Sequence, residues 1–61
     1  MVTDLSELIN HIKELISKYP HFKGDLIDIY QMAKDEIEEG GSEHHEIELA
    51  VESINELIGE V

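Results

Sequence analysis

Apolar residues recur along the first third of the chain at the spacing of an amphipathic helix. Intervals of three, four and one residue keep them on one face of a helix with 3.6 residues per turn. Thr3 or Asp4 can cap its start, and Pro20 ends it at or before Tyr19. The apolar positions are Leu5, Leu8, Ile9, Ile12, Leu15, Ile16 and Tyr19. The pattern predicts a helix over about 4–18.

A second apolar stripe follows Pro20 and stops at a pair of glycines. Its members are Leu26, Ile29, Tyr30, Ala33 and Ile37. Asp25 is the expected N-cap, although a proline at an N1 position also allows a turn to begin at Pro20. One residue of the Gly40–Gly41 pair is expected to supply the left-handed conformation that ends a helix. These signals predict a helix over about 24–39.

A third stripe begins after Ser42, which is the expected N-cap, with Glu43 and Glu46 in the first turns where the helix dipole favours acids. Its apolar members are Ile47, Ala50, Val51, Ile54, Leu57, Ile58 and Val61. They predict a helix over about 43–59. Three such helices joined by short turns predict an all-α fold, a small antiparallel three-helix bundle in which residues 1–61 form a single domain.

The charge of the chain is strongly negative and unevenly distributed. Residues 1–34 hold five carboxylates and four lysines, whereas residues 35–61 hold ten carboxylates and no lysine or arginine. The formal net charge is −11. A phosphate backbone or an anionic membrane would repel such a surface, so we expect neither direct nucleic acid binding nor membrane binding.

Several classes of function are disfavoured by what the sequence lacks. The chain has no cysteine, so it cannot form a disulfide or a cysteine-ligated zinc site. No apolar run approaches the roughly 20 residues that span a bilayer, and the N-terminus has no secretory signal, so the expected location is the cytoplasm. The serines fall on caps or outward faces, and a bundle of this size has little room for a substrate pocket. We therefore expect a protein that is not an enzyme and needs no cofactor.

Met32 and Leu49 are large apolar residues that fall outside the stripes. On a helical wheel Met32 lies about 120° from the centre of its stripe, and Leu49 lies nearly opposite the centre of its own. Such residues are often isolated exposed positions. They also resemble the apolar centre of an interface with a polar rim, and Glu48, Glu52 and Glu56 follow the face beside Leu49. The same acidic face is also compatible with a purely solubilising role.

Metal binding has only weak candidates. His44, His45 and Glu48 lie at the start of the third helix, where His44 and Glu48 are four residues apart and can point the same way. A closed structural site needs four ligands, so this set predicts weak divalent-metal binding at most. The segment 35–46 has Asp, Gly and Glu at positions 1, 6 and 12 of a calcium loop. It has Ile37 at position 3, which the core of the second helix requires.

The segment 35–58, DEIEEGGSEHHEIELAVESINELI, resembles small uncharacterised acidic helical proteins of tailed bacteriophages. The resemblance covers about half of the chain and depends on the Glu-Gly-Gly-Ser turn and the Glu-Ile-Glu-Leu helix. It implies an accessory protein that acts in the host cytoplasm. Many such proteins bind a host protein, and some mimic DNA.

The leading hypothesis is a non-enzymatic interaction protein, such as an inhibitor of a host protein, that binds a basic protein surface. The candidate contact residues are Glu48, Leu49, Glu52 and Glu56 on the third helix, with Asp35, Glu36, Glu39 and Met32 on the second. Three alternatives stay open. They are a nucleic-acid mimic that occupies a DNA- or RNA-binding cleft, a small structural homodimer, and a weak metal-binding module.

Overall fold

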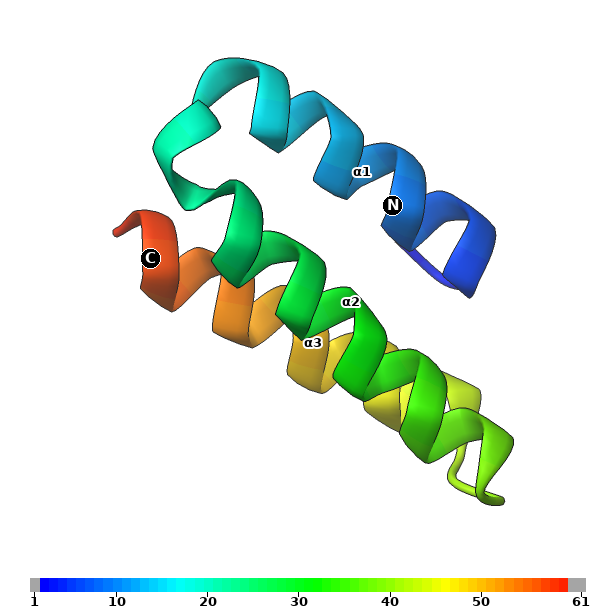
Figure 1. The fold of residues 1–61 in the computed structure, drawn as a ribbon. Helices are drawn as coiled ribbons and strands as arrows, with labels where there is room; N and C mark the ends of the chain where they lie inside the picture. The colour runs from blue at the N-terminus through cyan, green and yellow to red at the C-terminus, as the bar shows by residue number, and fades with distance from the viewer. Residues whose placement is uncertain (1, 60–61) are drawn as a thin grey trace.

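Three α-helices and one short 3-10 turn make up the computed structural model, which describes residues 2–59 (Figure 1). The elements are α1 (Leu5–Lys18), η1 (Pro20–Phe22), α2 (Lys23–Glu38) and α3 (Glu43–Ile58). Consecutive helices run in opposite directions, so α1 and α3 are parallel to each other. The predicted all-α three-helix bundle is confirmed. Val61, which the sequence places in the third apolar stripe, lies outside the described residues.

The start of α1 is capped by a side chain, as the sequence indicates. Asp4 is the N-cap, and its carboxylate accepts a hydrogen bond of 2.8 Å from the backbone N–H of Glu7. Thr3, the other candidate, instead donates to the carboxylate of Glu7 through its hydroxyl and its backbone N–H. Two N–H groups that would lack helical partners are thus satisfied by side chains.

The connection from α1 to α2 corrects one prediction. Asp25 is not the N-cap of α2, because the chain passes from η1 directly into a helix that begins at Lys23. Pro20 is the first residue of η1, where its missing N–H costs nothing. Asp25 instead lies in the first turn of α2, where the helix dipole favours a carboxylate. The half-buried Phe22 packs against the core and supports this turn.

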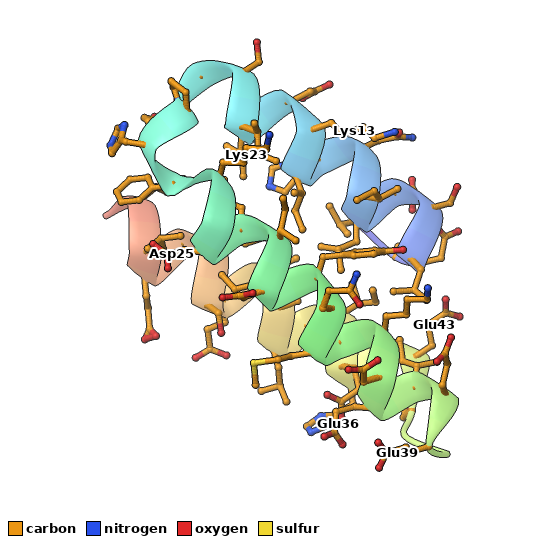
Figure 2. All side chains as sticks on the ribbon, viewed as in Figure 1. Lys13, Lys23, Asp25, Glu36, Glu39 and Glu43 are labelled. Carbon is orange, nitrogen blue, oxygen red and sulfur yellow. The ribbon has the colours of Figure 1, made fainter. Side chains whose placement is uncertain are left out.

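The turn between α2 and α3 is built on the two glycines. Gly40 has φ of 105°, and its N–H donates to the carbonyl of Ile37 at 3.1 Å. The N–H of Gly41 donates to the carbonyl of Glu36 at 2.8 Å, which completes a Schellman motif. Ser42 then caps α3 by accepting from the N–H of His45. The acidic side chains of Glu36 and Glu39 lie at this end of the molecule (Figure 2).

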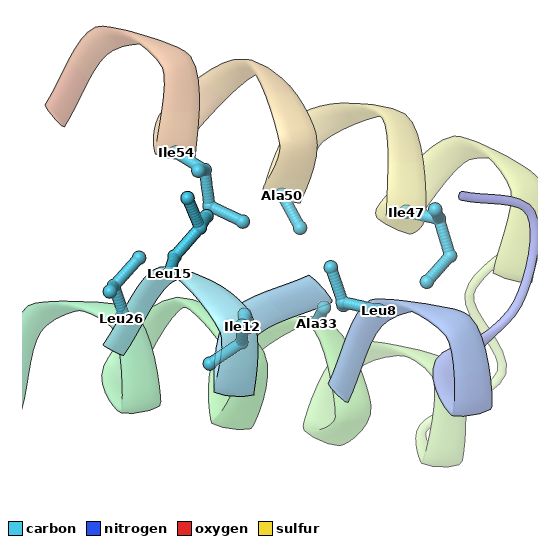
Figure 3. Packing of buried hydrophobic residues seen from close by; sticks show 8 residues of the cluster. All are labelled: Leu8, Ile12, Leu15, Leu26, Ala33, Ile47, Ala50 and Ile54. Carbon is cyan, nitrogen blue, oxygen red and sulfur yellow. The ribbon is translucent and has the colours of Figure 1, made fainter. Parts of the chain in front are cut away.

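Eight buried apolar residues from all three helices form the core (Figure 3). They are Leu8, Ile12, Leu15, Leu26, Ala33, Ile47, Ala50 and Ile54. Residues 2–59 place no polar or charged side chain among them. Ala33 and Ala50 are the small members of this core and lie on α2 and α3. Their short side chains fill little of the space between these two helices, which determines the shape of the surface described next.

Candidate functional site

A groove of about 270 Å³ runs between α2 and α3 on the outside of the bundle. The residues that line it, called here the α2–α3 groove, are Ile29, Met32, Ala33, Glu36, Glu46, Leu49, Ala50 and Ser53. All of them belong to α2 or α3, and α1 contributes none. The groove therefore opens on the side of the helix pair that α1 leaves uncovered.

Two of the residues that line the groove, Met32 and Leu49, are apolar residues that fall outside the predicted stripes. Met32 is 68% exposed and Leu49 is 44% exposed, and they reach the groove from different helices. Ala33 and Ala50 are buried beneath them and, because both are small, leave the groove hollow. The structure thus joins two separate sequence observations into one apolar surface.

Helical spacing explains which other residues reach the groove. Ile29 and Glu36 lie three residues before and four residues after Met32, and Glu46 and Ser53 have the same offsets from Leu49. Residues at these offsets share one face of a helix. Glu36 was a candidate from the sequence, whereas Ile29, Ala33, Glu46, Ala50 and Ser53 were not. Counting three and four residues from Met32 and Leu49 would have found Ile29, Glu46 and Ser53.

The other predicted acidic residues lie beyond the groove rather than in it. Asp35 and Glu39 on α2, and Glu48, Glu52 and Glu56 on α3, are all exposed, and none of them lines the groove. Asp35 and Glu39 nevertheless follow Met32 by three and seven residues, and Glu52 and Glu56 follow Leu49 by the same intervals. These four residues therefore lie on the helix faces that form the groove, whereas Glu48 does not. We define the acidic rim as Asp35, Glu36, Glu39, Glu46, Glu52 and Glu56.

Positive charge is scarce near this rim. No lysine or arginine follows Lys34 in the sequence, and Lys34 itself is half-buried. Lys13 lies on α1 and Lys23 is the first residue of α2, and both are away from the α2–α3 turn (Figure 2). Asp25, seven residues before Met32, adds a carboxylate at the opposite end of α2. The apolar part of the groove is therefore bordered mainly by carboxylates.

The candidate metal ligands form a pair rather than a cluster. Nε2 of His44 lies 3.3 Å from Oε2 of Glu48, and both side chains are largely exposed. His45 does not join them: within residues 2–59 no three His, Asp or Glu side chains converge as metal ligands would. The segment 35–46 is not a calcium loop here, because Asp35–Glu38 forms the last turn of α2.

Glu7, which lies on α1 and does not line the groove, has a pKa below its ordinary value. The hydroxyl of Thr3 and then its backbone N–H lower the pKa of Glu7, because both donate to its carboxylate. This carboxylate belongs to the cap of α1 and serves its stability.

Comparisons with protein-family models, curated proteins and solved structures gave no match for this chain. Within residues 2–59, no helix combines the length and the apolar character needed to cross a membrane.

Proposed function

We propose that this protein is a non-enzymatic interaction module that binds a basic protein surface through the α2–α3 groove and its acidic rim. The observation that carries the proposal is the convergence of Met32 and Leu49, from two helices, on one groove surrounded by carboxylates. An apolar centre with a polar rim is the usual anatomy of a protein interface.

The two parts of the surface have different roles in binding. Carboxylates in the rim attract a cationic partner over a Debye length and accelerate its approach, more strongly at low salt. Met32 and Leu49 supply the apolar area that the partner removes from water, which lowers the dissociation rate. A rim without an apolar centre would bind any cation weakly, whereas the combination can select one partner.

The composition of the groove supports a role in binding rather than catalysis. Its polar side chains are two carboxylates and the hydroxyl of Ser53, and no histidine is among its lining residues. A serine nucleophile needs an adjacent base to activate it. The context we propose is that of a phage accessory protein or inhibitor that acts on a host protein in the cytoplasm, as the resemblance of residues 35–58 implies.

The test is affinity capture from a bacterial lysate at low salt, followed by a salt step. The wild type is compared with the double variant Glu52→Lys/Glu56→Lys in the rim. Its control is Glu14→Lys/Glu38→Lys, which changes the net charge equally at two exposed positions outside the rim. We expect the same captured protein on the wild type and the control, and its loss from the rim variant.

Two other results would contradict the proposal in different ways. The same weak set of basic proteins on all three baits would mean that the acidic surface only solubilises the chain. A captured protein that added double-stranded DNA releases, and that needs neither Met32 nor Leu49, would indicate mimicry of nucleic acid.

A further inference from the structure

The open side of the α2–α3 pair is long enough for two turns of one more helix. From Ile29 to Glu36 the wall on α2 rises about 10 Å, which is two helical turns, and the wall from Glu46 to Ser53 rises equally. Helices pack by placing the side-chain ridges of one into the grooves of another. On its other side the same pair already accepts α1, whose Leu8, Ile12 and Leu15 are buried against it.

Backbone chemistry favours a helical occupant over an extended one. The walls of the groove are α-helices, whose own N–H and C=O groups are already paired within each helix. An extended segment laid along them would have no edge strand with which to pair its backbone groups. A helix satisfies those groups internally and presents only side chains to Met32 and Leu49.

Charge complementarity defines the rest of the occupant. Carboxylates border the groove on both helices, and no lysine or arginine follows Lys34. A second copy of this chain would bring another net charge of −11 and the same acidic rim to the contact, which like-charge repulsion opposes. A cationic partner gains attraction from the same groups.

From the length of this groove, the paired backbone of its walls and the carboxylates on its borders, we infer that the α2–α3 groove binds one amphipathic, cationic helix of a partner protein. Apolar residues at positions i, i+3, i+4 and i+7 of that helix cover two turns and contact Met32 and Leu49. Lysine or arginine residues on its flanks face the acidic rim. This inference rests on the proposed function and specifies the part of the partner that is recognised.

The affinity for such a helix in isolation is modest. Two turns of contact bury less surface than a standard protein interface, and an isolated short helix must order itself on binding. We expect a dissociation constant of about 1–100 μM for a peptide. Residues outside the groove would raise the affinity of an intact partner.

The test uses the full-length, ¹⁵N-labelled protein and two synthetic peptides of about 14 residues with identical composition. One peptide has leucines at i, i+3, i+4 and i+7 and lysines on the remaining face. The other has the same residues in an order without a stripe. Titrations followed by NMR report affinity and the residues affected, and circular dichroism reports peptide helicity.

Groove variants isolate the apolar contact from the electrostatic one. Met32→Glu and Leu49→Glu add a negative charge, so electrostatics alone would strengthen the binding of a cationic peptide. Ile27→Glu is the matched control, because Ile27 is also exposed on α2 but does not line the groove. Circular dichroism of each variant verifies that the bundle remains folded.

The expected result has three parts. The striped peptide becomes helical, shifts the signals of the groove residues, and binds at least about tenfold more tightly than its scrambled counterpart. Met32→Glu and Leu49→Glu each weaken it about tenfold or more, as the loss of one buried apolar contact implies. Ile27→Glu changes its affinity less than about twofold.

Two results would overturn the inference. Equal affinity of both peptides, reduced by Glu52→Lys/Glu56→Lys but not by Leu49→Glu, would refute a helix in the groove and leave the proposed basic-surface binding intact. Signals of Met32 and Leu49 that shift with protein concentration alone, and cease to shift in Leu49→Glu, would instead identify the occupant as a second copy.

Discussion

The backbone N–H of Leu5 donates a hydrogen bond to Oε2 of Glu43, with 3.3 Å between the two atoms. Leu5 is the first residue of α1 and Glu43 is the first residue of α3. The parallel helices therefore begin side by side, and a single carboxylate lies at both N-termini (Figure 2). Each N-terminus carries partial positive charge, which the carboxylate of Glu43 offsets at both helices, and at α1 the same carboxylate also accepts from an N–H group without a helical partner.

Replacement of Glu43 should therefore cost more stability than replacement of another exposed glutamate on α3. We expect Glu43→Ala to lower the free energy of unfolding by about 0.5–1.5 kcal/mol. Glu52→Ala is the control and should change the free energy of unfolding by less than about 0.5 kcal/mol. We expect this change to be a gain in stability, because the repulsion between neighbouring carboxylates decreases. Urea unfolding followed by circular dichroism measures both, and equal losses would show that the link to Leu5 contributes nothing.

The cap of α1 predicts a component of stability that depends on pH. Because Thr3 donates two hydrogen bonds to Glu7, the pKa of this carboxyl is lower in the folded state than in the unfolded chain. Its contribution is then fully present above the unfolded value of about 4.3 and disappears as the pH falls through the lower folded value. We expect Glu7→Gln to be less stable than the wild type at pH 7 and the difference to shrink towards pH 3.

The difference between Glu7→Gln and the wild type must be compared with that of a second α1 variant, Glu14→Gln. This control separates the cap from the general loss of one negative charge. Thermal unfolding at a series of pH values supplies the comparison. A gap for Glu7→Gln that stays constant between pH 7 and pH 3 would contradict the assignment.

Two glycines should respond in opposite ways to the same substitution. Gly24 lies within α2, and an added Cβ would meet no atom within 4 Å, so Gly24→Ala should stabilise the fold by about 0.5–1 kcal/mol. A Cβ on Gly41 would lie 2.7 Å from the carbonyl oxygen of Glu36, so Gly41→Ala should destabilise it by at least about 1 kcal/mol. Melting temperatures of the two variants that move in the same direction would contradict this prediction.

The stability of the bundle should rise with salt. Ten carboxylates without a lysine or arginine occupy residues 35–61, and added ions screen their mutual repulsion. We expect the melting temperature to increase from about 10 mM to about 500 mM NaCl. The increase should be smaller in Glu52→Lys/Glu56→Lys, because that variant has less repulsion to screen. A larger increase in the variant would show that rim repulsion is not the cause.

The helices and their ends could be predicted from local sequence because they depend on local interactions. Asp4 and Ser42 cap their helices through bonds to residues three positions away, and Gly40 provides the positive φ that ends α2. Asp25 was assigned wrongly as a cap because η1 lets the chain enter α2 without one. That choice depends on how Phe22 packs against the core, which is not a local property.

The candidate site was predicted only in its parts. The sequence alone indicated that Met32 and Leu49 lie outside the apolar stripes and that negative charge fills the second half of the chain. A helical wheel gives the angle of a residue on its own helix, but not which neighbouring helix lies beside it. The two residues were therefore separate candidates, and Glu46 and Ser53 were not candidates at all.

The sequence by itself determined three amphipathic helices, the caps of α1 and α3, the glycine turn after α2 and the acidic character of the surface, because spacing and composition are properties of the chain. Only the tertiary structure decided that Met32 and Leu49 share one groove with Glu36 and Glu46. The physical reason is packing: α1 covers one side of the α2–α3 pair, and the small Ala33 and Ala50 leave the other side hollow.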